Sequence, residues 1–425
     1  MVTAETLPIK TRDIRRTSGF MISGLSLGHV MFHWFGQSLI VVLPEIQSAF
    51  SLTGVGVGSL LTVRQFASAL VVIPGGVLVD MCRRYWGLLL SLSLGVLGLG
   101  SFIIGLAPVY PLLLVGIAVV AMTHAIWHLP VSAALSYHFP ERRAMALSFH
   151  GTGGSIGDVA GPVATGALLG ILSWRGVLSL YAAIPLFLAV VGLWALKGIG
   201  GTTDAEFPVL DRGARAERIK QLLKHPTLWG ITVVRGLRSM ALVAVLTFLP
   251  LYLDKNLGLS AFSRGFHIGL LITIGLIAKP ALGYVSDRLG RKTILVSGLV
   301  WSCALSLLLI PYNQGIALTI GIALLGLFLY PDQPILTATV LDIVNQEVAS
   351  TALGIVRFTG CILSGLSPLI AASLYEKIGV NATLYYVATL FGLAAVLLSI
   401  LRLIPADQSP ARDGTSVRPT TRKGS

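Results

Sequence analysis

Histidine, arginine and a few acidic side chains interrupt long apolar runs of this 425-residue chain. His29, His33 and Gln37 recur every four residues, so they share one helix face, and His124 and His128 do the same. Histidine titrates near neutral pH and can carry protons, whereas arginine presents a planar fork that suits carboxylate or phosphate. The candidates for substrate binding or proton coupling are His29, His33, Gln37, His124, His128, Asp158, Arg235, Asp332 and Arg357.

Cations and histidines outnumber the carboxylates inside these runs, which also hold Arg64, His150, Arg238 and Lys279. This imbalance favours a small anionic or hydrogen-bonding substrate, with protons as the coupling ion. No acid lies within one helical turn of Arg235 in its own run, so we expect a resting ion pair between Arg235 and Asp332. An anionic substrate would then displace Asp332. The alternative for any single residue is a structural polar contact between helices.

Paired histidines four residues apart can also ligate a metal ion. Neither a thiolate nor an acid other than Asp332 completes such a site, and the three cysteines are far apart in sequence. We therefore expect no metal site and no cofactor, and keep metal transport as an alternative. Because nothing resembles a hydrolytic triad, a nucleotide-binding loop or a redox centre, we expect no enzyme activity and no use of ATP.

The composition places these residues in a membrane protein. Charged residues make up 12% of the chain, hydrophobic residues 54%, and the mean hydropathy is +0.83. Soluble domains carry about 25% charged residues, so soluble enzymes, disordered chains and nucleic-acid binders are excluded despite a net charge of +13. Twelve runs are long enough to cross a bilayer: 19–43, 54–79, 87–107, 111–137, 145–172, 176–197, 227–253, 262–285, 293–311, 314–341, 349–374 and 382–404.

The distribution of lysine and arginine sets the orientation. Most of them lie in the tails, the central loop and alternate short loops, whereas one side carries only Arg175, Lys255, Arg264 and Lys377. We therefore expect a multi-pass protein of the plasma membrane with both termini in the cytoplasm. The predicted parts are an N-terminal tail (1–18), a six-helix bundle (19–197), a cytoplasmic linker (198–226), a second six-helix bundle (227–404) and a C-terminal tail (405–425). An amphipathic stretch near 210–224 is expected to lie on the inner leaflet.

The two halves repeat one another. Matching landmarks recur at an offset of 206 or 207 residues: Gly76 and Asp80 with Gly283 and Asp287, Pro44 with Pro250, and Pro162 with Pro368. The same offset places His29 opposite Arg235. Two like-built bundles with a substrate path between them, near the middle of the bilayer, follow as the predicted all-α architecture.

With these motifs the chain resembles the major facilitator superfamily. Residues 283–292, Gly-Tyr-Val-Ser-Asp-Arg-Leu-Gly-Arg-Lys, match its loop motif G-x-x-x-D-R-x-G-R-K in full, and residues 76–84 match it in part. The resemblance implies a transporter that works by alternating access, with this motif latching the cytoplasmic side in the outward-open state. The latch residues would be Gly76, Asp80, Arg84, Gly283, Asp287, Arg288, Gly290, Arg291 and Lys292.

A second motif bears on direction. The spacing of Gly157, Gly161, Pro162 and Gly166 is similar to the family's antiporter motif, in which small residues let helices approach and proline bends the span. Ser26-Leu-Gly-His29 and Trp127-His128-Leu129-Pro130 resemble the fosmidomycin-resistance efflux branch, which usually has His-Pro-Glu in its fourth span.

Export of a drug or metabolite is slightly favoured. The alternatives are proton-coupled uptake of an organic anion and a non-transporting sensor. The partners we expect are a small molecule, protons and lipid, with no nucleic acid, for a monomeric chain.

Overall fold

The computed structural model describes residues 14–200, 217, 220–344 and 349–403, and within these ranges it is helical with no strand. The first half contains η1 (Ile14–Arg16), α1 (Ser18–Val41), α2 (Leu43–Ala49), α3 (Gly54–Met81), η2 (Arg83–Tyr85), α4 (Trp86–Leu106), α5 (Tyr110–His138), α6 (Arg143–Leu168) and α7 (Trp174–Ala195). The second half contains α9 (Pro226–Lys255), α10 (Ala261–Leu289), α11 (Arg291–Leu308), α12 (Gly315–Leu329), α13 (Asp332–Ile343), α14 (Ala349–Gly365), α15 (Ser367–Lys377) and α16 (Val380–Ile400).

Each of the predicted spans coincides with a helix or with two consecutive helices. Ten helices of the described residues are long and apolar enough to cross a membrane, or eleven if the bent pair α1 and α2 counts as one span. Helix α6 is long enough but is not among them, because glycines, His150 and Asp158 dilute its apolar residues. The predicted all-α membrane fold is confirmed.

Local sequence explains where several of these helices begin. Thr17, Thr53, Ser173 and Ser260 each precede a helix, and each side-chain oxygen accepts a hydrogen bond from a backbone N–H in the first turn. These residues cap donors that have no partner within the helix. The apolar run that follows each cap continues the helix through the membrane.

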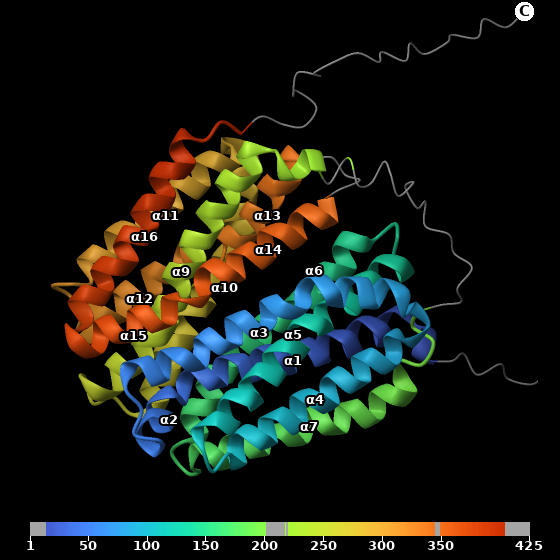
Figure 1. Ribbon diagram of the computed structural model, residues 1–425, viewed down its shortest axis with the longest axis horizontal. Coiled ribbons are helices and arrows are strands. Elements are labelled where there is room, and N and C mark those ends of the chain that lie inside the picture. The colour runs from blue at the N-terminus through green and yellow to red at the C-terminus, as the bar shows by residue number, and fades with distance from the viewer. Residues whose placement is uncertain (1–13, 201–216, 218–219, 345–348, 404–425) are drawn as a thin grey trace, which may run out of the picture.

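The helices form two bundles, blue to green and yellow to red in Figure 1. In the first, α1 packs on α6, α3 on α5, and α4 on α5 and α7; in the second, α9 packs on α14 and α16, α10 on α12, and α11 on α16. One buried apolar cluster lies mainly in the first bundle and also includes Leu251, Ile268 and Ile272 of α9 and α10, and a second lies in the second bundle. The predicted internal repeat corresponds to these two bundles, which share part of one core.

The repeated prolines do not act alike in the two halves. The chain bends by 55° at Val42, and Pro44 lies in the first turn of α2, whereas the equivalent Pro250 lies inside the continuous helix α9. Conversely, Pro162 lies inside α6, whereas Pro368 lies in the first turn of α15 after a break. A further break at Pro331 divides the predicted span 314–341 into α12 and α13.

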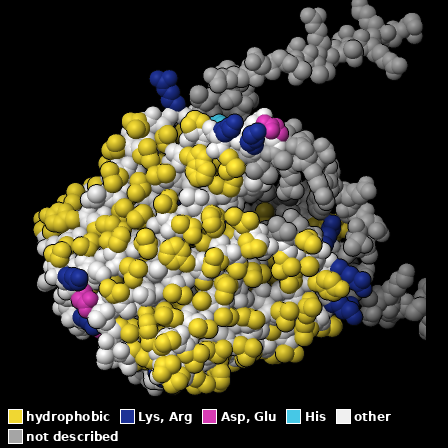
Figure 2. Space-filling model, in the orientation of Figure 1, with side chains coloured by type: hydrophobic (Ala, Val, Ile, Leu, Met, Phe, Trp, Pro, Cys, Tyr) yellow, Lys and Arg dark blue, Asp and Glu magenta, His cyan; other side chains and the backbone are white. Residues whose placement is uncertain are grey.

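The outer surface carries a broad apolar belt. Figure 2 shows hydrophobic side chains over most of the visible face, with lysine, arginine and acidic residues gathered at its two ends. Leu70, Ile277 and Val190 are more than 65% exposed, as expected for side chains that face lipid. Most of the amphipathic stretch predicted at 210–224, and most of the predicted tails and linker, lie outside the described residues.

The bundles meet closely at one end of the molecule, beside α2 and α15 in Figure 1. There α6 packs on α10, and α3 packs on α14 and α15. In the described residues, three polar contacts join the bundles: Gly54 N to Glu376 Oε2 at 2.6 Å, Gln65 Nε2 to Ser364 Oγ at 2.9 Å, and Arg264 to Glu45. By the sequence-based orientation, this end is the outer one.

Candidate functional site

Three helices of the first bundle bring the predicted histidines together. His29 on α1 is only 6% exposed, and its Nδ1 donates to the backbone oxygen of His150 on α6 at 2.8 Å. The other nitrogen, Nε2, is buried and has no hydrogen-bond partner in the described structure. His150 also stacks on His29, with ring centroids 4.1 Å apart. Sequence reasoning placed His150 in a span but did not include it in the site.

Asp158 of α6 anchors the rest of the polar face of α1. Its Oδ1 accepts hydrogen bonds from His33 Nδ1 and from Gln37 Nε2, both at 2.9 Å. The four-residue spacing puts His33 and Gln37 side by side on α1, so one carboxylate reaches both. The structure thus unites three predicted site residues that sequence alone did not connect.

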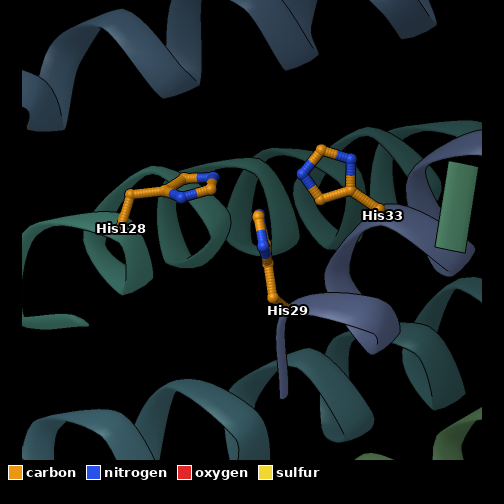
Figure 3. A group of neighbouring side chains, drawn as sticks. All are labelled: His29, His33 and His128. Carbon is orange, nitrogen blue, oxygen red and sulfur yellow. The ribbon is translucent and has the colours of Figure 1, made fainter. Parts of the chain in front are cut away.

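The α5 pair completes the cluster. His124 and His128 point the same way, with their Nε2 atoms 3.1 Å apart, so one ring donates to the other. The His128 ring contacts that of His29 edge to face at 4.9 Å, and His124 contacts His33 at 5.1 Å. In Figure 3, His29 lies between His33 and His128, and the three rings converge from α1 and α5.

Arginines surround this cluster. Arg64 of α3 donates to the backbone oxygen of Gly36 at 3.2 Å and lines, with His124, a small cavity between α1, α3 and α5. Arg357 of α14 interacts electrostatically with His124 and His128 across the bundle interface. Arg235 of α9 in turn lies near Arg357. Arg64 and Arg357 therefore lie near the histidines, and Arg235 lies near Arg357.

The predicted pair of Arg235 and Asp332 is wrong. Asp332 is held instead by Arg238, whose Nε and Nη2 bind the two carboxylate oxygens at 2.7 and 2.6 Å. Arg238 Nη2 also donates to Leu329 O, a carbonyl at the end of α12 that the break before α13 leaves without a helical partner. Arg238 and Asp332 are both buried and together hold the α12–α13 break.

Arg235 and Arg357 make no direct contact with a carboxylate among the described residues. In the described part of the chain, neither forms a hydrogen bond or an ion pair, and Arg357 is exposed. Asp332, the predicted partner of Arg235, is ion-paired with Arg238 and interacts with Arg235 only electrostatically. Neither Arg235 nor Arg357 thus has an ion-pair partner among the described residues.

The complete loop motif makes its contacts within the second bundle. Arg291 binds Asp342 of α13 at 2.5 Å and lies 3.7 Å from Asp287. Lys292 donates to Ser399 O in the last turn of α16 and to Leu401 O just beyond it. Gly290 joins α10 to α11 with φ of +92°, a conformation that glycine adopts without strain. Arg288 stacks on Tyr284.

The partial copy of the loop motif makes different contacts. Arg84 is exposed, its neighbour Arg83 donates to Gly200 O at 2.7 Å, and the side chain of Asp80 lies outside the described residues. An added Cβ at Gly76 or at Gly283 would meet open space. These glycines therefore have no packing role in this conformation.

The glycines of the α6 motif lie at two helix interfaces. A Cβ at Gly157 would come within 2.4 Å of Val30 O, and one at Gly161 within 2.8 Å of Trp34 O, both on α1. Gly166 faces Ala261 O of α10 at 2.5 Å, and Pro162 O approaches Gly265 of α10. Thr165, which replaces a usual glycine, donates to Ser38 Oγ at 2.8 Å. The motif packs α6 against both α1 and the second bundle.

A charge cluster at the end where the bundles meet was not recognised from the sequence. Arg264 of α10 is 1% exposed; it binds Asp254 of α9 at 2.5 Å and also binds Glu45 of α2 in the other bundle. Sequence analysis counted Arg264 only as a loop cation. A signal was present, because Glu45, Asp254 and Arg264 all flank span ends on the side with few charges.

Comparison with known proteins agrees with this architecture. The model of the Major Facilitator Superfamily matches residues 25–283 and 268–423. The fosmidomycin resistance protein of Escherichia coli (strain K12) is 22% identical over 305 residues, which are 70% of this chain and 72% of that protein. The hexuronate transporter of Bacillus subtilis (strain 168) is 25% identical over 408 residues, 91% of this chain and 95% of that protein.

A solved structure has the same fold. A bacterial homolog of the human lysosomal transporter Spinster, in an inward-facing and unoccupied conformation, aligns with a TM-score of 0.73 at 15% identity. The alignment covers 92% of this chain and 96% of that one. A second structure of the bacterial homolog, inward-facing and occupied, gives a TM-score of 0.72 at the same identity.

Proposed function

Because this chain belongs to the Major Facilitator Superfamily and its curated relatives are transporters, we propose that it moves a small organic anion by proton-coupled alternating access. Family and fold make it a multi-pass protein of the inner (plasma) membrane. The anionic substrate, the proton and the direction are the new parts of the proposal.

One observation carries the anionic substrate. Arg235 and Arg357 form no hydrogen bond or ion pair in the described residues, and Arg357 interacts electrostatically with His124 and His128. A charged side chain within a membrane span is costly unless it is paired or solvated. A carboxylate or phosphonate would supply that pairing through two parallel N–H···O bonds. These arginines would therefore bind the substrate.

Protons would move through the histidine cluster. The ionisable and charged groups facing it are His29 and His33 on α1, His124 and His128 on α5, His150 and Asp158 on α6, Arg64 on α3 and Arg357 on α14. His33 Nδ1 donates to Asp158 Oδ1 across the contact between α1 and α6. A change of charge in the histidine cluster would thus act on the packing of these two helices.

The contacts between bundles support an inward-facing conformation. With both termini in the cytoplasm, as we propose, the end closed by Arg264 and Glu45 faces outward. The loop motif, whose contacts stay within the second bundle, would form its latch between bundles only after the molecule opens outward. Export is favoured slightly by the α6 motif and by the name of the fosmidomycin resistance relative.

Uptake of an organic anion is the second candidate. The two unpaired arginines favour it equally, and one relative that aligns along 91% of the chain is named a hexuronate transporter. Direction depends on which side the substrate enters, so flux in both directions must be measured.

The test is transport into proteoliposomes that contain the purified full-length protein, with and without a pH gradient. Radiolabelled glucuronate and fosmidomycin serve as anionic probes, and betaine and a neutral sugar as the others. We expect an anion to accumulate only when a pH gradient is imposed, and Arg235→Lys or Arg357→Lys to lower the rate at least tenfold. Arg402→Lys, an exposed conservative change at the end of α16, is the matched control. Transport restricted to the neutral or zwitterionic probes would refute the anion proposal.

A further inference from the structure

We propose that His29, His33 and His128 form a binding site for a divalent transition-metal ion such as Zn²⁺. One ring nitrogen from each of the three lies within 4.8 Å of the others. Figure 3 shows the three rings converging from α1 and α5. Three histidines with one open position are a common zinc ligand set. This site adds to the proposed transport function and does not depend on it.

The hydrogen bond of His29 leaves its Nε2 atom available to bind a metal ion. Its Nδ1 donates to the His150 carbonyl, so in the neutral ring Nε2 carries the lone pair. That Nε2 is buried and has no partner in the described residues. A buried acceptor without a partner costs free energy, and a metal ion would satisfy it.

His33 is oriented in the same way by a carboxylate. Asp158 Oδ1 accepts from His33 Nδ1, which leaves Nε2 of the neutral ring as the lone-pair atom. Histidines that ligate metals commonly donate their other N–H to a carboxylate or to a backbone carbonyl, which fixes the ring and makes it a better ligand. His29 and His33 show one example of each. Asp158 also supplies negative charge close to a bound cation.

His128 gives the third ligand from a different helix. Its Nε2 lies 3.1 Å from His124 Nε2. A metal ion would bind the lone pair of His128 Nε2 and displace this hydrogen bond, with the proton staying on His124. Bonds of about 2.0–2.1 Å to tetrahedral zinc place nitrogen atoms closer together than 4.8 Å. The rings must therefore move inward slightly, which links α1 to α5 more tightly when the ion binds.

The sequence did not favour this site because no acid or thiolate accompanies these histidines along the chain. The fold places Asp158 beside His33, whereas Asp332, the acid considered from the sequence, binds Arg238. Arg64 and Arg357 lie near the α5 histidines. They oppose a second positive charge, so we expect one ion per chain and a moderate affinity.

The experiment uses the purified full-length protein in detergent and Co²⁺ as a spectroscopic substitute for Zn²⁺. We expect one Co²⁺ per chain, with the intense visible absorption of a four-coordinate ion, and loss of that absorption when Zn²⁺ is added. His29→Gln, His33→Gln and His128→Gln should each weaken Co²⁺ binding at least tenfold. His225→Gln, in a histidine that precedes α9 and lies outside the cluster, should bind as the wild type does.

Asp158→Asn tests whether Asp158 orients His33 without binding the metal ion itself. The amide still accepts from His33 but lacks the charge, so binding should weaken by less than with any of the three histidine changes. Size-exclusion profiles of every variant check that it is folded, and zinc-dependent thermal stabilisation provides a second readout. Absence of Co²⁺ binding in the wild type, or equal binding by the triple glutamine variant, would overturn the proposal. Anion transport can fail while metal binding succeeds, so the two proposals are tested separately.

Discussion

Arg235 and Arg238 lie less than one helical turn apart on α9, yet their side chains have different surroundings. Arg238 is buried in a bidentate pair with Asp332, and Arg235 has no such partner in the described chain. We expect Arg238→Ala to lower the stability of the folded protein by about 3–5 kcal/mol, because it leaves a buried carboxylate unpaired. Arg235→Ala should change stability little and reduce transport strongly.

Thermal unfolding of the two purified variants in one detergent measures this contrast. Arg238→Ala combined with Asp332→Ala should recover much of the lost stability, since it removes the unpaired charge as well. Equal destabilisation by Arg235→Ala and Arg238→Ala would contradict the assignment of Arg238 as the structural residue.

Histidine titration gives a second prediction at this scale. Glutamine at His29 or His128 keeps hydrogen bonding but does not titrate between about pH 5 and 8. In proteoliposomes, at least one of the two variants should transport at a rate independent of pH in this range. His267→Gln is the matched control, because His267 is a buried histidine in the other bundle that binds Ser263 O and Thr319 Oγ1. Wild-type pH profiles in both variants would place the proton path elsewhere.

For single residues, the sequence predicted which side chains share a face of a helix, but not which residues of other helices they contact. The spacing of His29, His33 and Gln37 predicted a common side of α1, and that side is the one that meets α5 and α6. It could not predict that Asp158 of α6 lies opposite, because that depends on how two helices are rotated against each other. The same limit explains why Arg235, and not Arg238, was paired with Asp332.

At the scale of elements, α6 is positioned by glycines that leave no room for a side chain. A methyl group at Gly157 would collide with the backbone of α1 at Val30 O. We expect Gly157→Ala to destabilise the protein by about 1–3 kcal/mol and to reduce transport. Gly151→Ala on the same helix meets open space and should be neutral or slightly stabilising, because alanine favours helix more than glycine does.

Unfolding temperatures and transport rates of the two α6 variants test this prediction at equal protein levels. If both alanines had the same effect, general helix propensity and not the close approach of α1 would explain the result.

The sequence predicted the helices, but it did not predict the breaks between them. Apolar runs of about 20 residues define membrane spans, and each predicted run contains helix. Proline did not reveal where helices break, since Pro162, Pro250 and Pro280 lie inside continuous helices whereas Pro44, Pro331 and Pro368 lie at breaks. Backbone groups that lose their helical partner at a break need another hydrogen-bond partner, as Leu329 O has in Arg238. Such partners lie on helices distant in sequence, so the sequence alone does not show where a break is tolerated.

At the scale of the whole molecule, the loop motif lies far from the closed end. Its aspartate, Asp287, is 67% exposed and is 3.7 Å from Arg291. Asp287→Asn should cut transport strongly without preventing membrane insertion, because the proposed latch forms only in the outward-open state. Cell fractionation and transport assays measure both. Normal flux at equal protein level would refute the role of the latch.

The opposite end should control how often the bundles separate. Arg264 binds Glu45 in the other bundle and Asp254 in its own. Arg264→Gln removes the ionic contact between bundles, so it should raise the population that is open at this end. Asp254→Asn leaves Glu45 paired and should have a much smaller effect.

Spin labels at Ser48 of α2 and Phe262 of α10, both exposed at this end, report the distance between the bundles directly. In the otherwise unchanged protein, with its three native cysteines replaced by serine, we expect one dominant distance. Arg264→Gln and Glu45→Gln should each add a longer distance, and the double variant should add no more than either alone, because both remove the same contact. A longer distance in Asp254→Asn of equal population would mean that the cluster stabilises α10 within its own bundle and does not hold the two bundles together.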